Sequence, residues 1–497
     1  MVTRDEMADA AAAVEAAERA GDSRATAEAL RRLSVLHHQR GSVSEARRLC
    51  ERSFTVAQSR GDMDLAAKAL NALGVQQMLG GAPVDADQSF QRALALGSRD
   101  TELRARVEQN LGILANIRGE LDAALDHYGR SLDAYRALGD AHGCALTAHN
   151  LGMVSADRGN HEEADRYFEE ALQGADRSND TALSALCLVS LAELDVVHQQ
   201  YESARQRAET ALTLFNGLGA QRGKADAYRV IGVVYRETGR PTLAESRLQS
   251  AIELAIASDA TLIEAESCRE LAVLLRTTGR NRDALRMLDR AHRLFHRLDA
   301  RPDTVNVGGR LAELQSTYLS VVREWGKSIE TTDSNTFGHC ERVARNAVAL
   351  ARALQLEEVD ETTILLGAYL HDVGMVRVPH EILTKTSPLT KDEIAVLQMH
   401  TVWGVELLAG IEFPWDIKPI VRWHHERCDG TGYPERLRGN EIPLGAQVVG
   451  ILDTYDNLVT GRCGAPAIES REAVWRIVDQ REGWTARVID AFVRTVV

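Results

Sequence analysis

The chain is 497 residues long, with 44% apolar and 26% charged residues and a formal net charge of −14 at pH 7. This length exceeds what one ordinary core accommodates, so we expect two or three domains. The acidic balance and the absence of a Lys/Arg-rich run argue against a nucleic acid partner. No apolar run approaches the roughly 18 residues of a membrane span, and no secretory leader is evident. The seven cysteines are scattered, as is typical of reduced thiols, so we expect a cytoplasmic protein without a membrane partner.

The first three hundred residues contain a repeat of 40 residues, shortened once to 38. Each repeat has a large apolar residue followed by a small one, at Leu33-Ser34, Leu73-Gly74, Leu111-Gly112, Leu151-Gly152, Leu191-Ala192, Ile231-Gly232 and Leu271-Ala272. Eight positions after the large residue comes glycine, except at Gln199, and thirteen positions after it comes alanine. Seventeen positions after it, most repeats have a bulky residue. Fixed offsets of this kind indicate stacked helix pairs.

The pattern has a simple physical interpretation. The small residue lets the first helix of a pair approach its neighbour closely, and the glycine ends that helix in a left-handed turn. The bulky residue would fill the gap between repeats. About seven such pairs, preceded by one helix over residues 3–20, predict an α-solenoid over residues 1–300.

These repeats resemble tetratricopeptide repeats in a long-helix variant. The resemblance implies a concave groove that holds a protein or peptide partner. A purely structural spacer is the alternative.

Residues 301–330 interrupt the repeat and predict a connecting helix. Its apolar positions form one stripe, made of Leu311, Leu314, Tyr318, Val321, Val322, Trp325 and Ile329. The stripe either transmits a signal between domains or acts as a passive linker. A homodimer through residues 305–330 is a further hypothesis.

From residue 331 onward, the chain predicts further helices with widely spaced histidines and aspartates. They are His339, His371, Asp372, His400, His424, His425 and Asp453. Their spacing places one or two side chains on each successive helix, all facing inward. This set of side chains is what a pair of hard or borderline metal ions requires.

The C-terminal region resembles an HD-GYP domain. The motifs that carry the resemblance are Gly338-His339, His371-Asp372-Val373-Gly374, the stretch from His424 to Pro434, and Ile451 to Asp456. The resemblance implies an all-helical bundle over residues 331–497 that hydrolyses the phosphodiester bonds of cyclic di-GMP, giving pGpG or GMP.

The resemblance also implies the roles of individual residues. His339, His371 and Asp453 would hold one divalent metal ion, His400, His424 and His425 a second, and Asp372 would bridge the two. Family resemblance implies iron, with manganese or zinc as alternatives. Asp372 and Arg462 would be catalytic, and Gly432, Tyr433, Pro434 and Arg462 would contact the substrate. Glu426 and Asp429 are expected not to be ligands themselves but either to accept hydrogen bonds from the free imidazole N–H groups or to fix the loop.

Three departures from the family pattern weaken the prediction of turnover. Met375 stands where the family has a lysine that contacts the substrate phosphate. Asn335 stands where members with a third metal have glutamate, so two metals are expected. After Arg462, the stretch 463–465 differs from the family sequence. The alternatives are therefore a phosphodiesterase for another nucleotide and a non-catalytic adaptor that binds metal and nucleotide.

Overall fold

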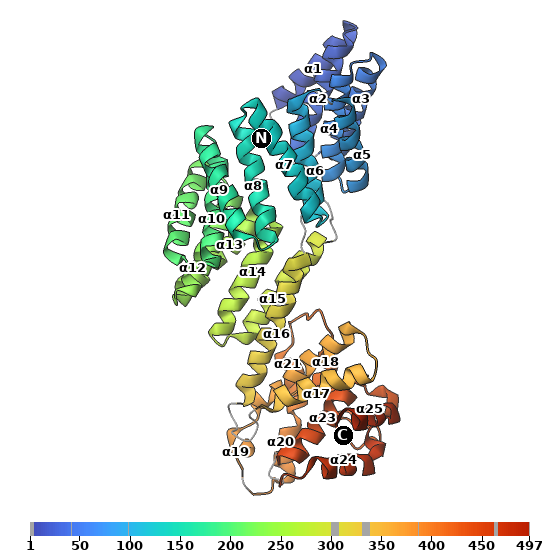
Figure 1. Cartoon of the computed structure of the whole chain (residues 1–497). Coiled ribbons are helices and arrows are strands. Elements are labelled where there is room, and N and C mark those ends of the chain that lie inside the picture. The colour runs from blue at the N-terminus through green and yellow to red at the C-terminus, as the bar shows by residue number, and fades with distance from the viewer. Residues whose placement is uncertain are drawn as a thin grey trace. The chain divides into compact units, whose positions relative to one another are not determined.

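The chain is described from a computed structural model that covers residues 4–40, 42–97, 99–299, 308–330, 338–385, 387–461 and 466–496. These residues form helices joined by turns, and no strand occurs among them (Figure 1). An isolated antiparallel bridge joins Asp429 and Arg438. The predicted all-α fold class is confirmed.

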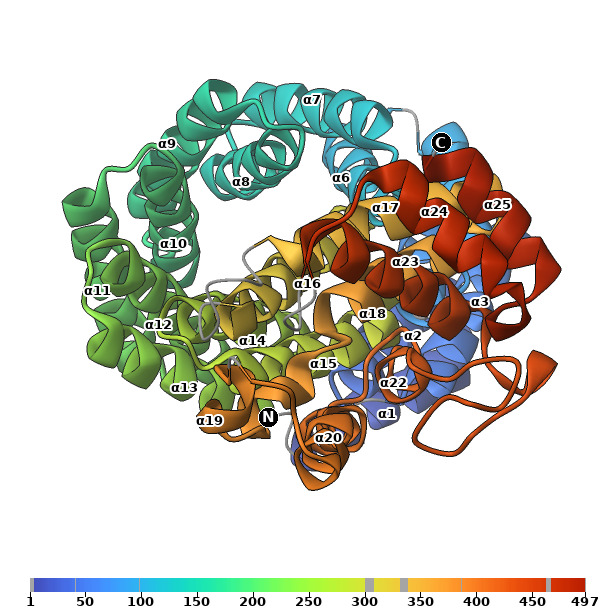
Figure 2. The same ribbon diagram turned by 90° about the horizontal axis from the view of Figure 1, so that it is seen from below.

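The N-terminal helices form the predicted solenoid. After α1 (Arg4–Arg19), each repeat is a hairpin of two antiparallel helices, and Figure 2 shows α7 to α13 following one another around a curve. In the described ranges the hairpins are α2/α3 (Ser23–Gln39, Val43–Ser59), α4/α5 (Met63–Leu79, Pro83–Leu96), α6/α7 (Thr101–Ile117, Leu121–Leu138), α8/α9 (Ala141–Asp157, His161–Arg177), α10/α11 (Thr181–Val197, Tyr201–Leu218), α12/α13 (Gln221–Glu237, Pro241–Ala257) and α14/α15 (Thr261–Thr277, Asn281–Asp299).

In the hairpin turns that the structure describes, the turn residue is left-handed, as the glycine pattern predicts. The φ angle is 75° at Gly119, 78° at Gly159 and 72° at Gly239. Gln199, which replaces glycine in one repeat, adopts the same conformation with φ of 61°. The geometry of the turn is therefore kept even where the favoured residue is missing, at a cost in backbone strain.

The small residue of each repeat lies against the bulky one of the same hairpin. A Cβ atom built on Gly152 would lie 2.6 Å from the ring of Phe168, and one on Gly112 would lie 2.6 Å from Tyr128. Phe90 also shares a buried cluster with Leu111 of the next hairpin. The bulky residue thus packs within its own hairpin as well as towards the next repeat, which extends the sequence prediction.

Aspartates begin many of the first helices of the hairpins. At each of them, the carboxylate accepts a hydrogen bond from the backbone N–H three residues later, which satisfies a donor that the helix leaves unpaired. The aspartates are Asp22, Asp62, Asp100, Asp140 and Asp180. Each such cap stabilises its helix by about 1 kcal/mol.

The predicted connecting helix is present as α16 (Gly308–Glu330). Its apolar stripe is largely buried within the chain, with Tyr318, Val321 and Val322 each 0% exposed and Leu314 1% exposed. The stripe is therefore covered by the chain's own residues.

Contacts between Cα atoms divide the chain into two compact units. The first comprises residues 1–267 and 293–311, and the second comprises residues 268–292 and 312–497. The second unit thus includes the end of α14 and much of α15 together with the C-terminal helices. The domain limits expected from the sequence, 1–300, 301–330 and 331–497, stay predictions.

The C-terminal helices surround a core made by α17, α18, α23 and α25. Val343, Leu370, Val448 and Phe492 contribute to it and are each 0% exposed. The helices are α17 (His339–Ala353), α18 (Glu358–Leu370), η1 (Val373–Arg377), α19 (His380–Leu383), α20 (Lys391–Gln398), α21 (His400–Leu407), α22 (Lys418–Trp423), η2 (Gly439–Glu441), α23 (Leu444–Thr460), α24 (Ser470–Asp479), η4 (Arg481–Gly483) and α25 (Ala486–Val496).

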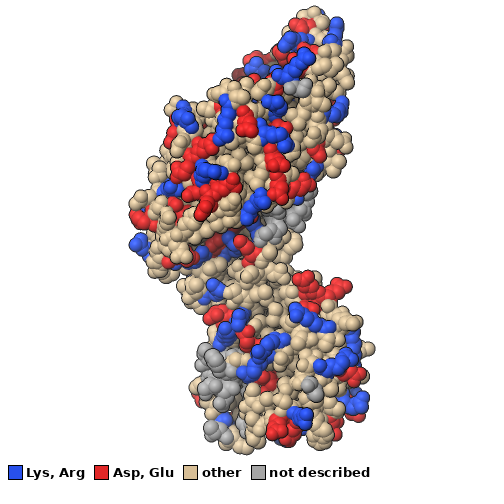
Figure 3. Space-filling model, viewed as in Figure 1, with Lys and Arg blue, Asp and Glu red and all other residues tan. Residues whose placement is uncertain are grey.

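The surface of the repeats is charged but mixed in sign. On the face shown in Figure 3, basic and acidic side chains alternate over the repeat helices and do not separate into areas of one sign. Within the described part of the chain, no helix has the length and apolar character needed to cross a membrane.

Candidate metal centre

The side chains predicted to bind metal lie at helix ends and in one helix. His339 is the first residue of α17, after Gly338 with φ of 80°, and His371 directly follows α18. His400 is the first residue of α21, His424 and His425 follow α22, and Asp453 lies within α23. Asp372 follows His371. Because most of these residues lie at or next to helix ends, the helices fix the backbone positions from which the side chains extend towards a common centre.

The structure brings all seven side chains together in two groups. One group consists of Asp372, His400, His424 and His425, and the other of His339, His371 and Asp453. Within each group, the potential ligand atoms lie within 4.8 Å of one another. The division is the one that the family resemblance implies, although the role of each residue as a ligand stays a prediction.

In four of the imidazoles, the outer nitrogen, which is Nδ1, faces away from the centre and lies close to a backbone or side-chain acceptor. Nδ1 lies 2.7 Å from the Ala368 carbonyl oxygen in His371, 2.7 Å from that of Leu397 in His400, and 3.0 Å from that of Val421 in His424. A carbonyl oxygen only accepts, so each Nδ1 carries the proton. In a neutral ring, Nε2 then presents its lone pair to the centre.

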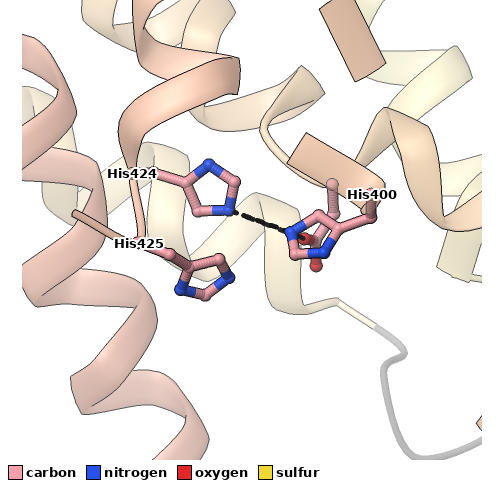
Figure 4. A group of neighbouring side chains, drawn as sticks. His400, His424 and His425 are labelled. Atoms are coloured by element: carbon pink, nitrogen blue, oxygen red, sulfur yellow. Dashed lines mark hydrogen bonds and ion pairs between the residues drawn. The ribbon is translucent and has the colours of Figure 1, made fainter. Parts of the chain in front are cut away.

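The inward nitrogens face one another in pairs. Nε2 of His339 lies 3.2 Å from Nε2 of His371, and Nε2 of His400 lies 3.4 Å from Nε2 of His424, as Figure 4 shows for the second pair. Two lone pairs at this distance repel unless a cation lies between or beside them. This geometry, with carboxylates nearby, fits divalent metal ions.

Asp372 lies between the two groups. Its Oδ1 is 3.5 Å from Nε2 of His400, and its Oδ2 is 3.5 Å from Nε2 of His371. Its two oxygens thus face different groups, which is compatible with the bridging role expected from the sequence; that role stays a prediction. Asp453 also reaches both sides, with Oδ1 3.3 Å from Nε2 of His339 and Oδ2 3.8 Å from Nδ1 of His425.

Burial keeps the second group of imidazoles neutral. It lowers the pKa of His400, lowers that of His424 much further, and lowers the pKa of His425 to about 4. Burial by itself raises the pKa of the Asp453 carboxyl, but His339 and His425 outweigh it, and the pKa falls well below its usual range. At neutral pH, His400, His424 and His425 are therefore neutral imidazoles and Asp453 is an ionised carboxylate, which are the forms that bind metal.

Two glycines let the helices that carry these residues approach closely. A Cβ atom on Gly374 would overlap the carbonyl of His400, and one on Gly450 would overlap the carbonyl of His424. Larger residues would push η1 away from α21 and α23 away from the end of α22. The glycines therefore help to set the distances within the centre.

The loop after His425 is held by a buried carboxylate. Glu426 is 3% exposed and accepts hydrogen bonds from the backbone N–H groups of Glu435, Arg436 and Leu437, at 2.6, 3.0 and 2.9 Å. Asp429 accepts from the backbone N–H of Thr431 at 2.9 Å and from its hydroxyl at 2.6 Å. Glu426 and Asp429 thus fix the loop, as the sequence suggests.

The residues predicted to contact substrate differ in their surroundings. The ring of Tyr433 stacks on His425 with centroids 4.8 Å apart, so it lies beside the metal centre. Pro434 follows it and is partly buried. Gly432 packs against backbone atoms of residues 425–427, where a Cβ atom would clash. Arg462 and Asn335 lie outside the described residues.

The structure also clarifies the Met375 position. Met375 lies in η1, and Arg377 in the same short helix places its Nη1 2.5 Å from Oε2 of Glu406. Arg377 is therefore paired with Glu406 on α21, and among the described residues it makes no polar contact with the seven side chains of the centre.

Asp456 and Arg342 support His339, and the sequence analysis assigned them no role. Asp456 Oδ2 lies 2.7 Å from Nδ1 of His339, and the Arg342 guanidinium donates to both oxygens of Asp456 at 2.7 and 2.9 Å. A carboxylate on the outer nitrogen fixes the orientation of a ligating imidazole and raises its basicity. The signal in the sequence was the second aspartate of the stretch Asp453-Thr454-Tyr455-Asp456.

Family models match both parts of the chain. The model described as HD domain matches residues 327–485. Models described as tetratricopeptide repeat match residues 26–59, 103–177 and 143–217.

Several curated bacterial proteins are similar to the C-terminal part. The cyclic di-GMP phosphodiesterase response regulator RpfG of Xanthomonas campestris is 34% identical over 185 residues, which are 37% of this chain and 49% of the relative. A cyclic di-GMP phosphodiesterase of Thermotoga maritima is 32% identical over 169 residues, 33% of this chain and 46% of the relative. The 3'3'-cGAMP-specific phosphodiesterase 2 of Vibrio cholerae is 35% identical over 150 residues, 30% of this chain and 29% of the relative.

The chain thus spans half or less of the length of these relatives. The matched residues nevertheless contain every described side chain of the two ligand groups. The chain carries an HD domain in its C-terminal region, preceded by tetratricopeptide repeats, and this domain is homologous to domains of proteins named as cyclic di-GMP phosphodiesterases.

Proposed function

We propose that this protein is a metal-dependent phosphodiesterase that hydrolyses cyclic di-GMP to pGpG or GMP, under the control of its repeat array. The observation that carries the proposal is the pair of ligand groups with Asp372 between them. The names of the relatives RpfG and the Thermotoga maritima enzyme support the choice of substrate.

His339, His371 and Asp453 would hold one divalent ion, and His400, His424 and His425 the other, with Asp372 shared. The predominance of imidazole favours iron, manganese or zinc over magnesium or calcium, and we propose iron. Ions in these positions would supply Lewis acidity, which makes water a better nucleophile and stabilises negative charge on phosphoryl oxygens.

The protein's own groups would orient the substrate around these ions. Tyr433 would contact a nucleotide base or ribose beside the centre, and its stacking on His425 supports this proposal. Glu426 keeps the Gly432 to Pro434 segment in position through its three hydrogen bonds. Arg462 would contact phosphate. Met375 offers no positive charge, so the phosphate would be held less tightly than in relatives with lysine.

The repeat array would bind a protein or peptide partner in its groove and thereby change activity. A homodimer through residues 305–330 is also proposed, and it would need surface beyond the buried stripe of α16. A monomeric mass in sedimentation at micromolar concentration would exclude it.

The experiment is hydrolysis by the full chain, purified without oxygen and loaded with Fe²⁺ or Mn²⁺. Cyclic di-GMP and 3'3'-cGAMP are supplied separately, and the products are separated by chromatography. We expect pGpG or GMP from cyclic di-GMP, and loss of both in the His371→Ala, Asp372→Ala double variant. Two bound ions per chain without any product would instead favour the non-catalytic adaptor, and faster hydrolysis of 3'3'-cGAMP would change the assigned substrate.

A further inference from the structure

The middle part of the last repeat hairpin, residues 268–292, belongs to the same compact unit as the metal centre. Its sequence carries the repeat pattern at Leu271, Gly279 and Ala284, as in the hairpins before it. Residues 268–292 nevertheless group with residues 312–497. A helix pair that is a repeat by sequence is thus part of the unit that holds the candidate metal ligands.

This hairpin contacts the loop that joins α21 to α22. The loop runs from Leu408 to Ile417, and Leu408, Ile411 and Ile417 are each 0% exposed. His400 begins the helix before the loop, and His424 and His425 directly follow the helix after it. The loop joins the two helices beside which the three histidines of the second ligand group lie, so its position affects their placement together with the packing of α21 on η1 and of α22 on α23.

Two contacts from α15 and one from α16 hold the loop. On α15, the Arg282 guanidinium donates to the Ala409 carbonyl oxygen at 3.2 Å, and the ring of His292 lies 6.5 Å from that of Trp415. On α16, the ring of Tyr318 meets the same Trp415 edge to face, with centroids 5.5 Å apart and planes at 89°.

The first ligand group is supported in a different way. His339, His371 and Asp453 lie on α17, α18 and α23, which pack directly on one another. The contacts of α16 with these helices come from its later turns: Arg323 pairs with Glu341 of α17 at 2.8 Å, and Gly326 packs on the Tyr369 backbone of α18. None of these described contacts passes through the Leu408–Ile417 loop.

From this arrangement we propose that Trp415 is a positioning residue through which the last repeat hairpin controls the second ligand group alone. Movement of α15 shifts the loop, changes the spacing of His400 relative to His424 and His425, and changes the affinity for the second ion. The first ion keeps its affinity. The inference rests on the proposed binuclear centre, and it gives the repeat array a defined route to the metal site.

The test is a Mn²⁺ titration of the metal-free full chain, followed by electron paramagnetic resonance and by metal analysis. The variants are Trp415→Ala, which removes the ring, and Trp415→Phe, which retains an aromatic contact with Tyr318. Arg282→Ala removes the hydrogen bond from α15 to the loop and leaves the buried apolar residues of the loop unchanged. Trp475→Ala is the matched control, because Trp475 lies on α24 and is 64% exposed.

We expect wild-type protein to bind two Mn²⁺ ions in two steps. In Trp415→Ala, the second step should weaken by about 10-fold or more, which is the range for residues that orient metal ligands, while the first step is unchanged. Arg282→Ala should weaken the second step less. Trp415→Phe and Trp475→Ala should behave like the wild type.

Unchanged steps in both Trp415→Ala and Arg282→Ala, or equal weakening of the two steps, would overturn the inference. Binding of only one ion by the wild-type chain would overturn it together with the binuclear centre. The proposed function fails separately, if the wild type shows two binding steps and hydrolyses neither cyclic dinucleotide. Thermal unfolding of each variant, followed by circular dichroism, shows that the fold is retained.

Discussion

At the scale of single residues, the candidate centre depends on how each imidazole is held from behind. His371, His400 and His424 donate Nδ1–H to backbone carbonyls, whereas His339 uses the carboxylate of Asp456. A backbone carbonyl is present whatever the side chain is, but the side-chain carboxylate of Asp456 can be removed by substitution. Asp456 therefore offers a way to weaken one ligand without altering it.

Asp456→Ala should lower metal affinity at the first ligand group by about 10-fold to 100-fold, because the His339 ring loses its fixed orientation and part of its basicity. Metal titration of the metal-free protein measures the change. Asp456→Asn keeps a hydrogen-bond acceptor without the charge, so the metal affinity of this variant should lie between those of the wild type and Asp456→Ala. An affinity in Asp456→Ala equal to that of the wild type would show that Asp456 serves the fold alone.

Met375→Lys should raise the rate of cyclic di-GMP hydrolysis. A charge-assisted hydrogen bond to phosphate contributes about 1.5–3 kcal/mol, which corresponds to roughly tenfold to hundredfold in rate if it acts in the transition state. Steady-state kinetics measure the effect, with Met375→Leu as the control for side-chain volume. A slower Met375→Lys enzyme would mean that a cation at this position does not reach the phosphate.

The ligand types could be predicted from the sequence, but their supports could not. Histidine and aspartate at wide, regular spacing are visible in one dimension. The contact between His339 and Asp456 joins residues 117 positions apart. The sequence alone would allow each of these two residues to pair with many other side chains. The same holds for Asp372, whose two oxygens face different groups in a centre where η1 packs closely against α21 at Gly374.

At the scale of elements, the hairpins show how a strict local pattern fixes geometry. The left-handed turn recurs at the same position in each described hairpin turn, and Gln199 adopts it without being glycine. The offsets between small, bulky and turn residues were sufficient to predict this part of the fold. Each hairpin is made from contacts close in sequence, and such contacts leave the clearest trace in a sequence.

Gln199→Gly should raise the stability of the repeat unit by up to about 1 kcal/mol. The substitution relieves a left-handed strain of about 1–2 kcal/mol, and the greater freedom of glycine in the unfolded chain offsets part of it. Gly239→Ala creates the reverse situation at the matching turn and should destabilise the unit. Chemical unfolding followed by circular dichroism measures both, and a loss of stability in Gln199→Gly would contradict the explanation.

At the scale of the whole molecule, two compact units share one chain, and the limit between them falls inside a repeat. The sequence pattern continues through Leu271 and Ala284 as though the array ended near residue 300. Nothing in that pattern distinguishes a hairpin that serves the array from one that packs on other helices. The contacts of α15 that distinguish this hairpin are made with Ala409 and Trp415, more than 100 residues further along the chain.

Removal of metal should act on one unit only. Without cations, the facing Nε2 atoms of His339 and His371, and of His400 and His424, repel each other, whereas binding stabilises the folded state by mass action. In differential scanning calorimetry, a chelator should lower the melting temperature of the unit with the metal centre and leave that of the repeats in place. Added Mn²⁺ should reverse the shift, and an unchanged thermogram would argue against a bound metal in this centre.

The position of the last hairpin also bears on how such a protein can diversify. Hairpins from α2 to α13 can be gained, lost or exchanged without touching Trp415, since each hairpin contacts mainly its neighbours. The sequence of the α14/α15 hairpin is constrained twice, by its place in the repeat pattern and by its contacts with the Leu408–Ile417 loop. The earlier hairpins can therefore change and bind new partners, while the contacts between the α14/α15 hairpin and the Leu408–Ile417 loop stay the same.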